Sequence, residues 1–180
     1  MKSTRLFTIV IADDEPMIRN GLAANVPWAS LGFDLLGTCE DGQEVIDLCR
    51  SNSVDAILAD IRMPGVSGIE LAEVIEREAP STYVLFLTAY SDFSYAQAAI
   101  EHGVWRYLIK PVNYAELLET IRELHQELKT ARETEVTEAA PEDHADPLVR
   151  AVEEYLTCHF RHASLSEISR RLGLTPEHVS

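Results

Sequence analysis

The chain has 180 residues, of which 46% are hydrophobic and 25% charged, the composition of a soluble globular protein with room for one ordinary domain and a smaller piece. Its formal net charge of −15 argues against a predominantly basic nucleic-acid surface and against adsorption to anionic lipid. The three cysteines lack metal-ligand spacing, so we expect reduced thiols in a cytoplasmic protein.

Short apolar runs alternate with stretches of helical periodicity along the first 132 residues. The first run is cut off by three acidic residues and is too short to span a membrane, so we expect a strand there. Strands that alternate with helices predict an α/β, doubly wound domain, with a parallel sheet covered on both faces. The expected strands are Leu6–Ala12, Leu35–Cys39, Val54–Ala59, Tyr83–Leu87 and Trp105–Ile109, and the expected helices are Glu15–Asn25, Gly42–Ser51, Gly68–Glu78, Phe93–His102 and Tyr114–Arg132.

Polar residues stand at the ends of four of these strands. In doubly wound sheets, ligands bind beyond the carboxyl ends of the strands, so these residues are expected to face one crevice. Two carboxylates about 4 Å apart repel by roughly 4 kcal/mol at an effective dielectric near 20, and three in one crevice therefore require a cation. Oxygen ligands without histidine or cysteine favour Mg²⁺. The residues are Asp13 and Asp14, Asp60, Thr88 and Lys110.

Asp60 ends a run that is otherwise expected to be a buried strand, where an unpaired carboxylate costs several kcal/mol. A carboxylate flanked by a cation and by the Lys110 ammonium can act as a nucleophile toward a phosphoryl group. Thr88 can then donate a hydrogen bond to a phosphoryl oxygen. The sequence therefore predicts that Asp60 is phosphorylated.

Four segments, "IADDEP", "ILADIRMPGVSGIEL", "VLFLTAYSDFSYAQAAI" and "VWRYLIKPV", resemble the receiver domain of two-component response regulators, over about residues 4–128. The segment "PWASLGFDLLGTCEDGQEVI" resembles the subgroup whose receivers are joined to AraC-type DNA-binding domains, often called YesN-like. The resemblance implies a flavodoxin-like, five-stranded parallel sheet in the order 2-1-3-4-5, with a long last helix.

Carried over residue by residue, the resemblance makes Asp60 the phosphoacceptor. Asp13 and Asp14 become the acidic pair that holds Mg²⁺, with Asp14 bound directly and Asp13 through water. The backbone carbonyl of Arg62 would be a further metal ligand.

The same resemblance identifies the residues that would bind the phosphoryl group or respond to it. Thr88 and Lys110 would bind its oxygens, and Tyr107 falls at the family's aromatic switch position. Lys110–Pro111 falls at the family's usual cis peptide.

Apolar residues after Lys110 recur in steps of four and three, which predicts a heptad seam of about two repeats at Leu117, Ile121, Leu124 and Leu128. The first half is expected to pack on the sheet, and the part beyond about Gln126 to pair with a second subunit in a homodimer that phosphorylation strengthens. A frayed helix leading into a linker is the alternative.

The acidic segment 133–146 has no basic residue and predicts a solvated linker. The expected domains are therefore a receiver (1–128), a helix extension with an acidic linker (129–146) and a smaller all-α module (147–180).

Residues 147–180 have a helix-turn-helix outline, with a turn at Gly173, a cap at Thr175 and Pro176 in the following first turn. They resemble the opening of the AraC-type domain, although Ser169 replaces its usual alanine. The resemblance stops at Ser180, inside the expected recognition helix, so we expect DNA binding only through the complete domain and not by this fragment.

We therefore expect a cytoplasmic response regulator that a sensor histidine kinase phosphorylates on Asp60 and that controls transcription. No enzymatic activity is expected beyond phosphotransfer to itself and autodephosphorylation. A phosphatase of the haloacid dehalogenase type is one alternative, but it requires a second aspartate where this chain has Arg62. A receiver that is never phosphorylated and serves only for dimerisation is another.

Overall fold

The computed structural model describes residues 6–89 and 93–138. Within them, all strands pair in parallel in one sheet with the order β2-β1-β3-β4-β5, which confirms the predicted doubly wound fold. The strands are β1 (Phe7–Ala12), β2 (Phe33–Cys39), β3 (Ala56–Ala59), β4 (Tyr83–Thr88) and β5 (Arg106–Ile109).

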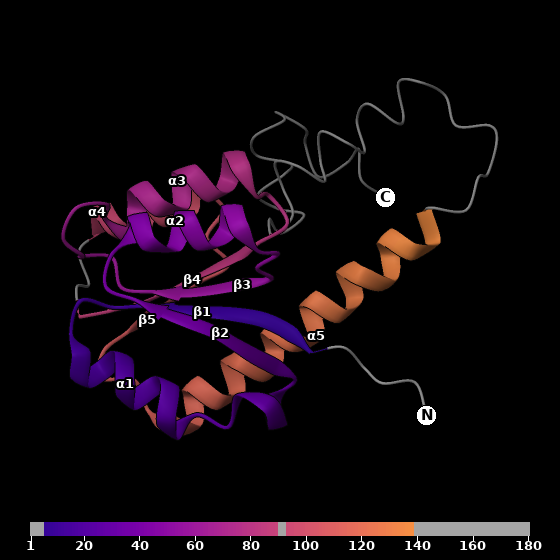
Figure 1. The fold of residues 1–180 in the computed structure, drawn as a ribbon, viewed down its shortest axis with the longest axis horizontal. Helices are drawn as coiled ribbons and strands as arrows, with labels where there is room; N and C mark the ends of the chain where they lie inside the picture. The colour runs from indigo at the N-terminus through magenta and orange to yellow at the C-terminus, as the bar shows by residue number, and fades with distance from the viewer. Residues whose placement is uncertain (1–5, 90–92, 139–180) are drawn as a thin grey trace, which may run out of the picture. The chain divides into compact units, whose positions relative to one another are not determined.

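Helices cover both faces of the sheet, as Figure 1 shows. α1 and α5 lie on one face, and α2, α3 and α4 lie on the other. The described helices are α1 (Pro16–Asn25), the short 3-10 helix η1 (Trp28–Leu31), α2 (Gly42–Ser51), α3 (Gly68–Glu78), α4 (Phe93–Glu101) and α5 (Tyr114–Glu138).

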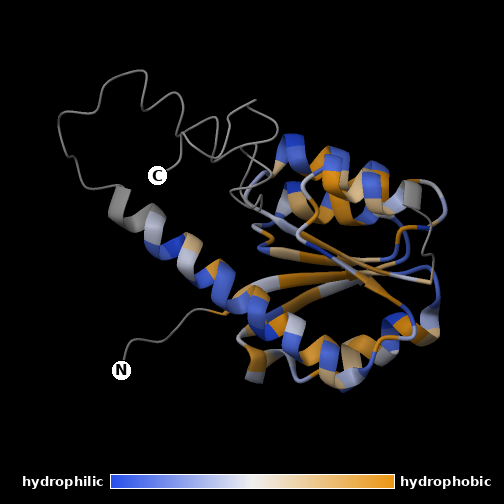
Figure 2. Cartoon of the chain, turned by 180° about the vertical axis from the view of Figure 1, so that it is seen from behind, coloured by the Kyte–Doolittle hydropathy of each residue, from blue (hydrophilic) through white to orange (hydrophobic). Residues whose placement is uncertain are grey.

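The central strands are apolar along their whole length because both of their faces are buried. In β1, Ile9 and Ile11 pack into the cluster beneath α1 and α5, while Val10 and Ala12 pack into the cluster beneath α2 and α3. This alternation follows from the two-residue period of a strand. Figure 2 shows mostly hydrophobic strands in the centre and helices in which hydrophobic and hydrophilic residues alternate.

The segment between α1 and β2 was not predicted correctly. η1 buries Trp28 and Leu31, and it ends at Gly32, whose φ of 89° is left-handed and favours glycine. A side chain at Gly32 would also collide with the ring of His125 on α5. β2 therefore begins at Phe33, earlier than expected, where it pairs with Phe7.

α5 is longer than predicted and packs on its own domain. It extends to Glu138, so the beginning of the expected solvated linker is helical. Arg132 contacts Asp55 at 3.2 Å, and its guanidinium lies 4.1 Å from the ring centre of Phe7. These contacts hold the distal part of the helix against the sheet.

The expected seam packs on the sheet of its own domain along its whole length, as predicted for its first half and unlike the prediction for Leu128. Its four residues are at most 5% exposed and belong to the core that α5 forms with the sheet. A heptad-like stripe of apolar residues can pack against a sheet as well as against another helix. Here all four seam residues pack on the sheet. The four residues are Leu117, Ile121, Leu124 and Leu128.

The remaining linker residues and the helix-turn-helix segment 147–180 lie outside the described residues. Among the helices of the described ranges, none combines the length and apolar character that a membrane span requires.

Candidate functional site

The strand register brings the predicted polar residues to one edge of the sheet. Ala12 of β1 pairs with Ala59 of β3, so Asp13 and Asp60, the residues that follow them, leave the sheet side by side. On the other side of β3, Thr88 ends β4, and its carbonyl oxygen accepts a hydrogen bond from the Lys110 amide at 2.8 Å. Residues far apart in the sequence thus meet beyond the carboxyl ends of the strands.

Asp60 is 5% exposed, and both of its carboxylate oxygens accept hydrogen bonds. Oδ1 accepts hydrogen bonds from the backbone amides of Ile61 at 2.6 Å and Arg62 at 3.3 Å. Oδ2 accepts a hydrogen bond from Nζ of Lys110 at 3.0 Å. These three donors fix the orientation of the carboxylate at the sheet edge.

Asp13 is the second buried carboxylate of the site. Its Oδ2 accepts a hydrogen bond from Nζ of Lys110 at 2.7 Å, so the ammonium bridges Asp13 and Asp60. Its Oδ1 accepts from the backbone amide of Glu15 at 2.9 Å. The Lys110–Pro111 peptide is cis, as the resemblance implies.

The ammonium of Lys110 remains charged in this crevice. Burial by itself lowers the pKa of Lys110, but its hydrogen bonds to Asp13 and Asp60 and the negative charges of these carboxylates raise the pKa above its ordinary value. The lysine therefore supplies a permanent positive charge beside Asp60.

The third carboxylate near Asp60 is Glu15, which differs from the predicted set. Oxygens of Asp13, Glu15 and Asp60 lie within 4.8 Å of one another, whereas Asp14 is exposed and outside this cluster. The turn that follows β1 decides which of these acids faces the crevice. Glu15 directly follows Asp14 in the run "DDE", so the sequence does not indicate which of the two lies near Asp60.

The donor set of this cluster fits Mg²⁺. Carboxylate oxygens are the ligands that this hard cation prefers, and Mg²⁺ commonly uses few protein ligands and keeps several waters. Two of the three carboxylates are buried and Glu15 is exposed, so one side of the cluster opens to water. With one ammonium among them, three carboxylates keep two uncompensated negative charges, which a divalent cation matches.

The other predicted residues lie nearby in different settings. Thr88 is fully buried at the end of β4. Tyr107 on β5 is half-buried, and its ring meets that of Phe86 edge-on with 6.4 Å between the ring centres. The metal-binding carbonyl of Arg62 and the switch role of Tyr107 stay predictions.

Two positions that support the site were not foreseen. Gly68 begins α3 directly against Asp60, and a Cβ at this position would collide with the Asp60 carbonyl oxygen. Arg19 on α1 is buried, and its guanidinium donates to the Asp13 carbonyl oxygen at 2.6 Å. A glycine is common where two backbone segments approach each other closely, so the sequence offers some indication of the role of Gly68. It holds no comparable signal that the side chain of Arg19 is buried.

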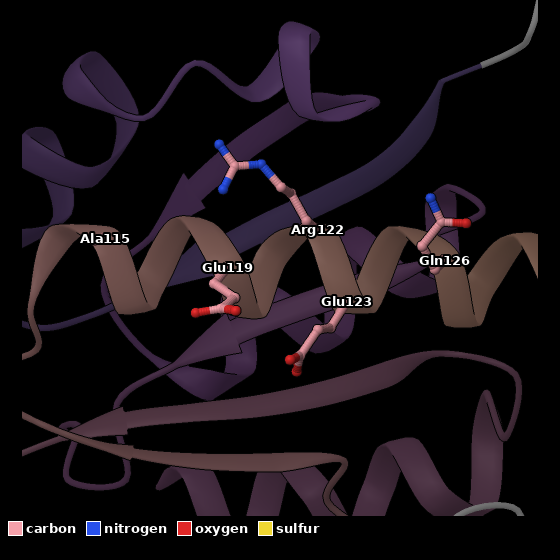
Figure 3. A pocket seen from close by; sticks show the side chains of 5 residues that line it. All are labelled: Ala115, Glu119, Arg122, Glu123 and Gln126. Atoms are coloured by element: carbon pink, nitrogen blue, oxygen red, sulfur yellow. The ribbon is translucent and has the colours of Figure 1, made fainter.

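A hollow on the outer face of α5 is separate from this site. Figure 3 shows Arg122 pointing to one side of the helix and Glu119 and Glu123 to the other. Glu123 pairs with Arg106 of β5. None of the residues around Asp60 lines this hollow, which Ala115, Glu119, Arg122, Glu123 and Gln126 form.

Comparison with protein families matches residues 9–122 to the response regulator receiver domain. The chain is similar to YesN of Bacillus subtilis, an uncharacterized transcriptional regulatory protein, with 33% identity over 124 residues, 69% of this chain and 34% of that protein. It is also similar to the transcriptional regulatory protein HptR of Staphylococcus aureus, with 38% identity over 112 residues, 62% of this chain and 44% of HptR.

Solved structures show the same fold. The receiver domain of the response regulator AraT from Geobacillus stearothermophilus has 31% identity and a TM-score of 0.66, covering 71% of this chain and 98% of that one. A two component transcriptional regulator AraC from Clostridium phytofermentans has 34% identity and a TM-score of 0.64, covering 70% and 98%. The chain spans 34% to 57% of the length of the first curated relatives.

Proposed function

Because the chain belongs to the response regulator receiver domain family, we propose that Asp60 accepts a phosphoryl group from a sensor histidine kinase and thereby switches a transcription regulator. The observation that carries this proposal is the Asp60 carboxylate itself. It is buried at the sheet edge, accepts hydrogen bonds from two backbone amides and from Lys110, and lies next to two further carboxylates.

The transfer is a displacement at phosphorus. A carboxylate oxygen of Asp60 forms the new bond to phosphorus while the bond between phosphorus and the donor's imidazole nitrogen breaks. The imidazole leaves with that electron pair and takes up a proton, and Asp60 becomes an acyl phosphate. Lys110, already 3.0 Å from Asp60, is placed to pair with the new phosphoryl oxygens.

Asp13, Glu15 and Asp60 are the residues whose clustered oxygens would hold Mg²⁺, with the exposed Asp14 and the Arg62 carbonyl as further candidate ligands. When bound, the cation neutralises charge on the phosphoryl oxygens. Thr88 is proposed to donate to a phosphoryl oxygen, and Tyr107 to turn inward in the phosphorylated state. A phosphoryl group shifts this equilibrium because it interacts differently with the two conformations.

The proposed output is an AraC-type DNA-binding domain in a cytoplasmic regulator. The outline of residues 147–180 and the transcriptional regulators among the relatives support this assignment. DNA binding is proposed for the complete domain only. No activity on other substrates is proposed.

We also propose that phosphorylation strengthens a homodimer, through the outer surfaces of α4, β5 and α5 rather than the buried seam. Ile100 and Ile109 are exposed apolar residues on α4 and β5. Typical coupling of about 1–3 kcal/mol corresponds to roughly 5- to 150-fold in dimer affinity. Sedimentation of the wild type and of Ile100→Asp, each with and without phosphodonor, tests this proposal. Equal monomers in every sample would contradict it.

The phosphoacceptor assignment is tested by intact mass after incubation with Mg²⁺ and acetyl phosphate. We expect a gain of one phosphoryl group in the wild type and none in Asp60→Asn. Asp34→Asn is the matched control, because Asp34 is an exposed aspartate on β2. A phosphoryl group retained in Asp60→Asn would refute Asp60 as the acceptor, and no gain in the wild type would favour the never-phosphorylated module.

A further inference from the structure

Arg19 is a buried arginine that the phosphoryl transfer itself does not use. It is 7% exposed on the first turns of α1. Its Nη1 donates to the Asp13 carbonyl oxygen at 2.6 Å, and its Nη2 donates to Oε1 of Glu40 at 2.7 Å. Burying a guanidinium costs free energy unless the group is well paired. An apolar residue would avoid this cost, so the hydrogen bonds of Arg19 need an explanation of their own.

The contacts of Arg19 fix the loop that joins β1 to α1. Asp13 donates its backbone amide to the Cys39 carbonyl at 3.2 Å and gives its own carbonyl to Arg19. The Arg19 amide in turn donates to the Glu15 carbonyl at 3.0 Å. Both ends of the short segment 13–15 are thus bound to one residue, and this segment carries two of the three carboxylates of the acidic cluster.

Glu40 connects Arg19 to the neighbouring loops. It follows β2, and its side chain is 67% exposed apart from the contact with Arg19. Two residues later, at the start of α2, the Gly42 amide donates to the Val66 carbonyl at 3.0 Å, and a Cβ at Gly42 would crowd that carbonyl. Val66 precedes α3, whose first residue, Gly68, lies against Asp60. A continuous set of contacts therefore runs from Arg19 through two loops to the proposed phosphoacceptor.

We propose that Arg19 is a positioning residue for the acidic site. Its guanidinium bridges the Asp13 carbonyl and Glu40, and so holds the carboxylates of Asp13 and Glu15 where they form one oxygen cluster with Asp60. The inference rests on the proposed function for its biological meaning, but cation binding tests it separately. Residues that orient metal ligands commonly affect metal affinity by about 10- to 100-fold.

The sign of the effect separates positioning from simple electrostatics. Removing a positive charge beside a cation site strengthens cation binding on coulombic grounds. If Arg19 positions the ligands, its removal instead weakens the binding of Mg²⁺. The two accounts therefore predict opposite changes for the same variant.

The experiment is an Mg²⁺ titration followed by amide NMR shifts, without phosphodonor, on the wild type and on Arg19→Met and Arg19→Lys. Arg50→Met is the matched control, because Arg50 pairs with Glu78 in an exposed ion pair between α2 and α3. Thermal unfolding in EDTA reports any loss of stability separately. We expect about ten-fold weaker Mg²⁺ binding in Arg19→Met, a smaller loss in Arg19→Lys and no change in Arg50→Met.

Unchanged or tighter Mg²⁺ binding in folded Arg19→Met would overturn the proposal, and a lower unfolding temperature alone would mark Arg19 as a packing residue. If Arg19→Met does not fold, Arg19→Lys decides, because lysine keeps the charge but does not reproduce the two-pronged guanidinium contact. Wild-type affinity in Arg19→Lys would then overturn it. Failure of the wild type to accept phosphate would refute the proposed function and leave this test in force.

Discussion

α3 and α4 cover the same face of the sheet but are anchored very differently. α3 begins with a reciprocal capping box between Ser67 and Glu70 and buries Leu71 and Ile75. α4 has no acidic residue in its first turn and no basic residue in its last, and its Ile100 is 69% exposed. Capping and apolar burial are the main local sources of helix stability in a folded protein.

The two helices therefore differ in how much local capping and apolar burial stabilises them. α3 starts against Asp60, so its anchoring holds the proposed phosphoacceptor in place. α4 lies beyond Thr88 in the chain and leaves Ile100 exposed, so it buries less apolar surface in the described residues than α3 does. Elements with few buried apolar contacts open at a lower free energy than the core, which suits a two-state switch.

The largest effect is expected from truncating matched apolar residues on the two helices. Leu71→Ala opens a cavity at a fully buried site and should lower the free energy of unfolding by about 2–5 kcal/mol. Ile100→Ala should change it by no more than about 0.5 kcal/mol because the side chain is largely exposed. Urea unfolding followed by circular dichroism measures both. Equal losses would remove the distinction between the helices.

Thiol reactivity tests the fixed side of the sheet, where Cys39 and Cys49 share a hydrophobic cluster with Leu71. Burial raises the pKa of Cys39 to about 12 and that of Cys49 to about 11. At pH 8 the folded protein should therefore hold about 1,000-fold and about 100-fold less thiolate at these sites than the unfolded chain. Iodoacetamide labelling in a Cys158→Ser background, with and without urea, measures the difference. Rapid labelling of folded Cys39 would contradict the expected rigidity.

The same shifts determine a pH dependence of stability. The folded state binds the thiol protons more tightly than the unfolded state, so this contribution is complete below pH 9 and declines as pH rises from 9 toward the folded values. Cys39→Ser should lose stability less steeply than the wild type in this window. Unfolding midpoints between pH 8 and 10.5 provide the check, and identical slopes would argue against the pKa shift.

Removing the cap of α3 should have a moderate effect. Ser67→Ala removes the side-chain acceptor of the Glu70 amide and should cost about 1 kcal/mol. Ser51→Ala is the matched control, because the Ser51 hydroxyl donates to the Asp47 carbonyl at the exposed end of α2. A loss in the control as large as in Ser67→Ala would indicate that the capping box contributes nothing specific.

The smallest effect is expected at the contact between Glu76 of α3 and His102, the residue after α4, where Oε2 and Nδ1 are 3.2 Å apart. Exposed pairs contribute little, so His102→Gln should change the unfolding free energy by less than about 0.5 kcal/mol. Hydrogen exchange should nevertheless become faster in α4 and stay unchanged in α3. Equal acceleration in both helices would show that they open as one unit.

Much of the candidate site could be predicted from the sequence. Asp13, Asp60, Thr88 and Lys110 follow or end apolar runs, and parallel strands place such positions at one edge by their common direction. The proximity of Glu15 to Asp13 and Asp60 could not be predicted, because neighbouring acids in one turn differ only in the direction that the folded backbone gives them. Nor could the burial of Arg19, since its partners are a backbone carbonyl and a residue from another loop.

The alternation of strands and helices can be predicted from the sequence alone, because the periodicity of apolar residues is a local property of each element. What each apolar face packs against depends on the tertiary structure. The stripe from Leu117 to Leu128 specifies a buried face on α5, but it is equally compatible with a partner helix and with a sheet. The sheet occupies it because apolar residues of different strands, such as Ile9, Leu58 and Leu85, come together against α5 only in the folded domain.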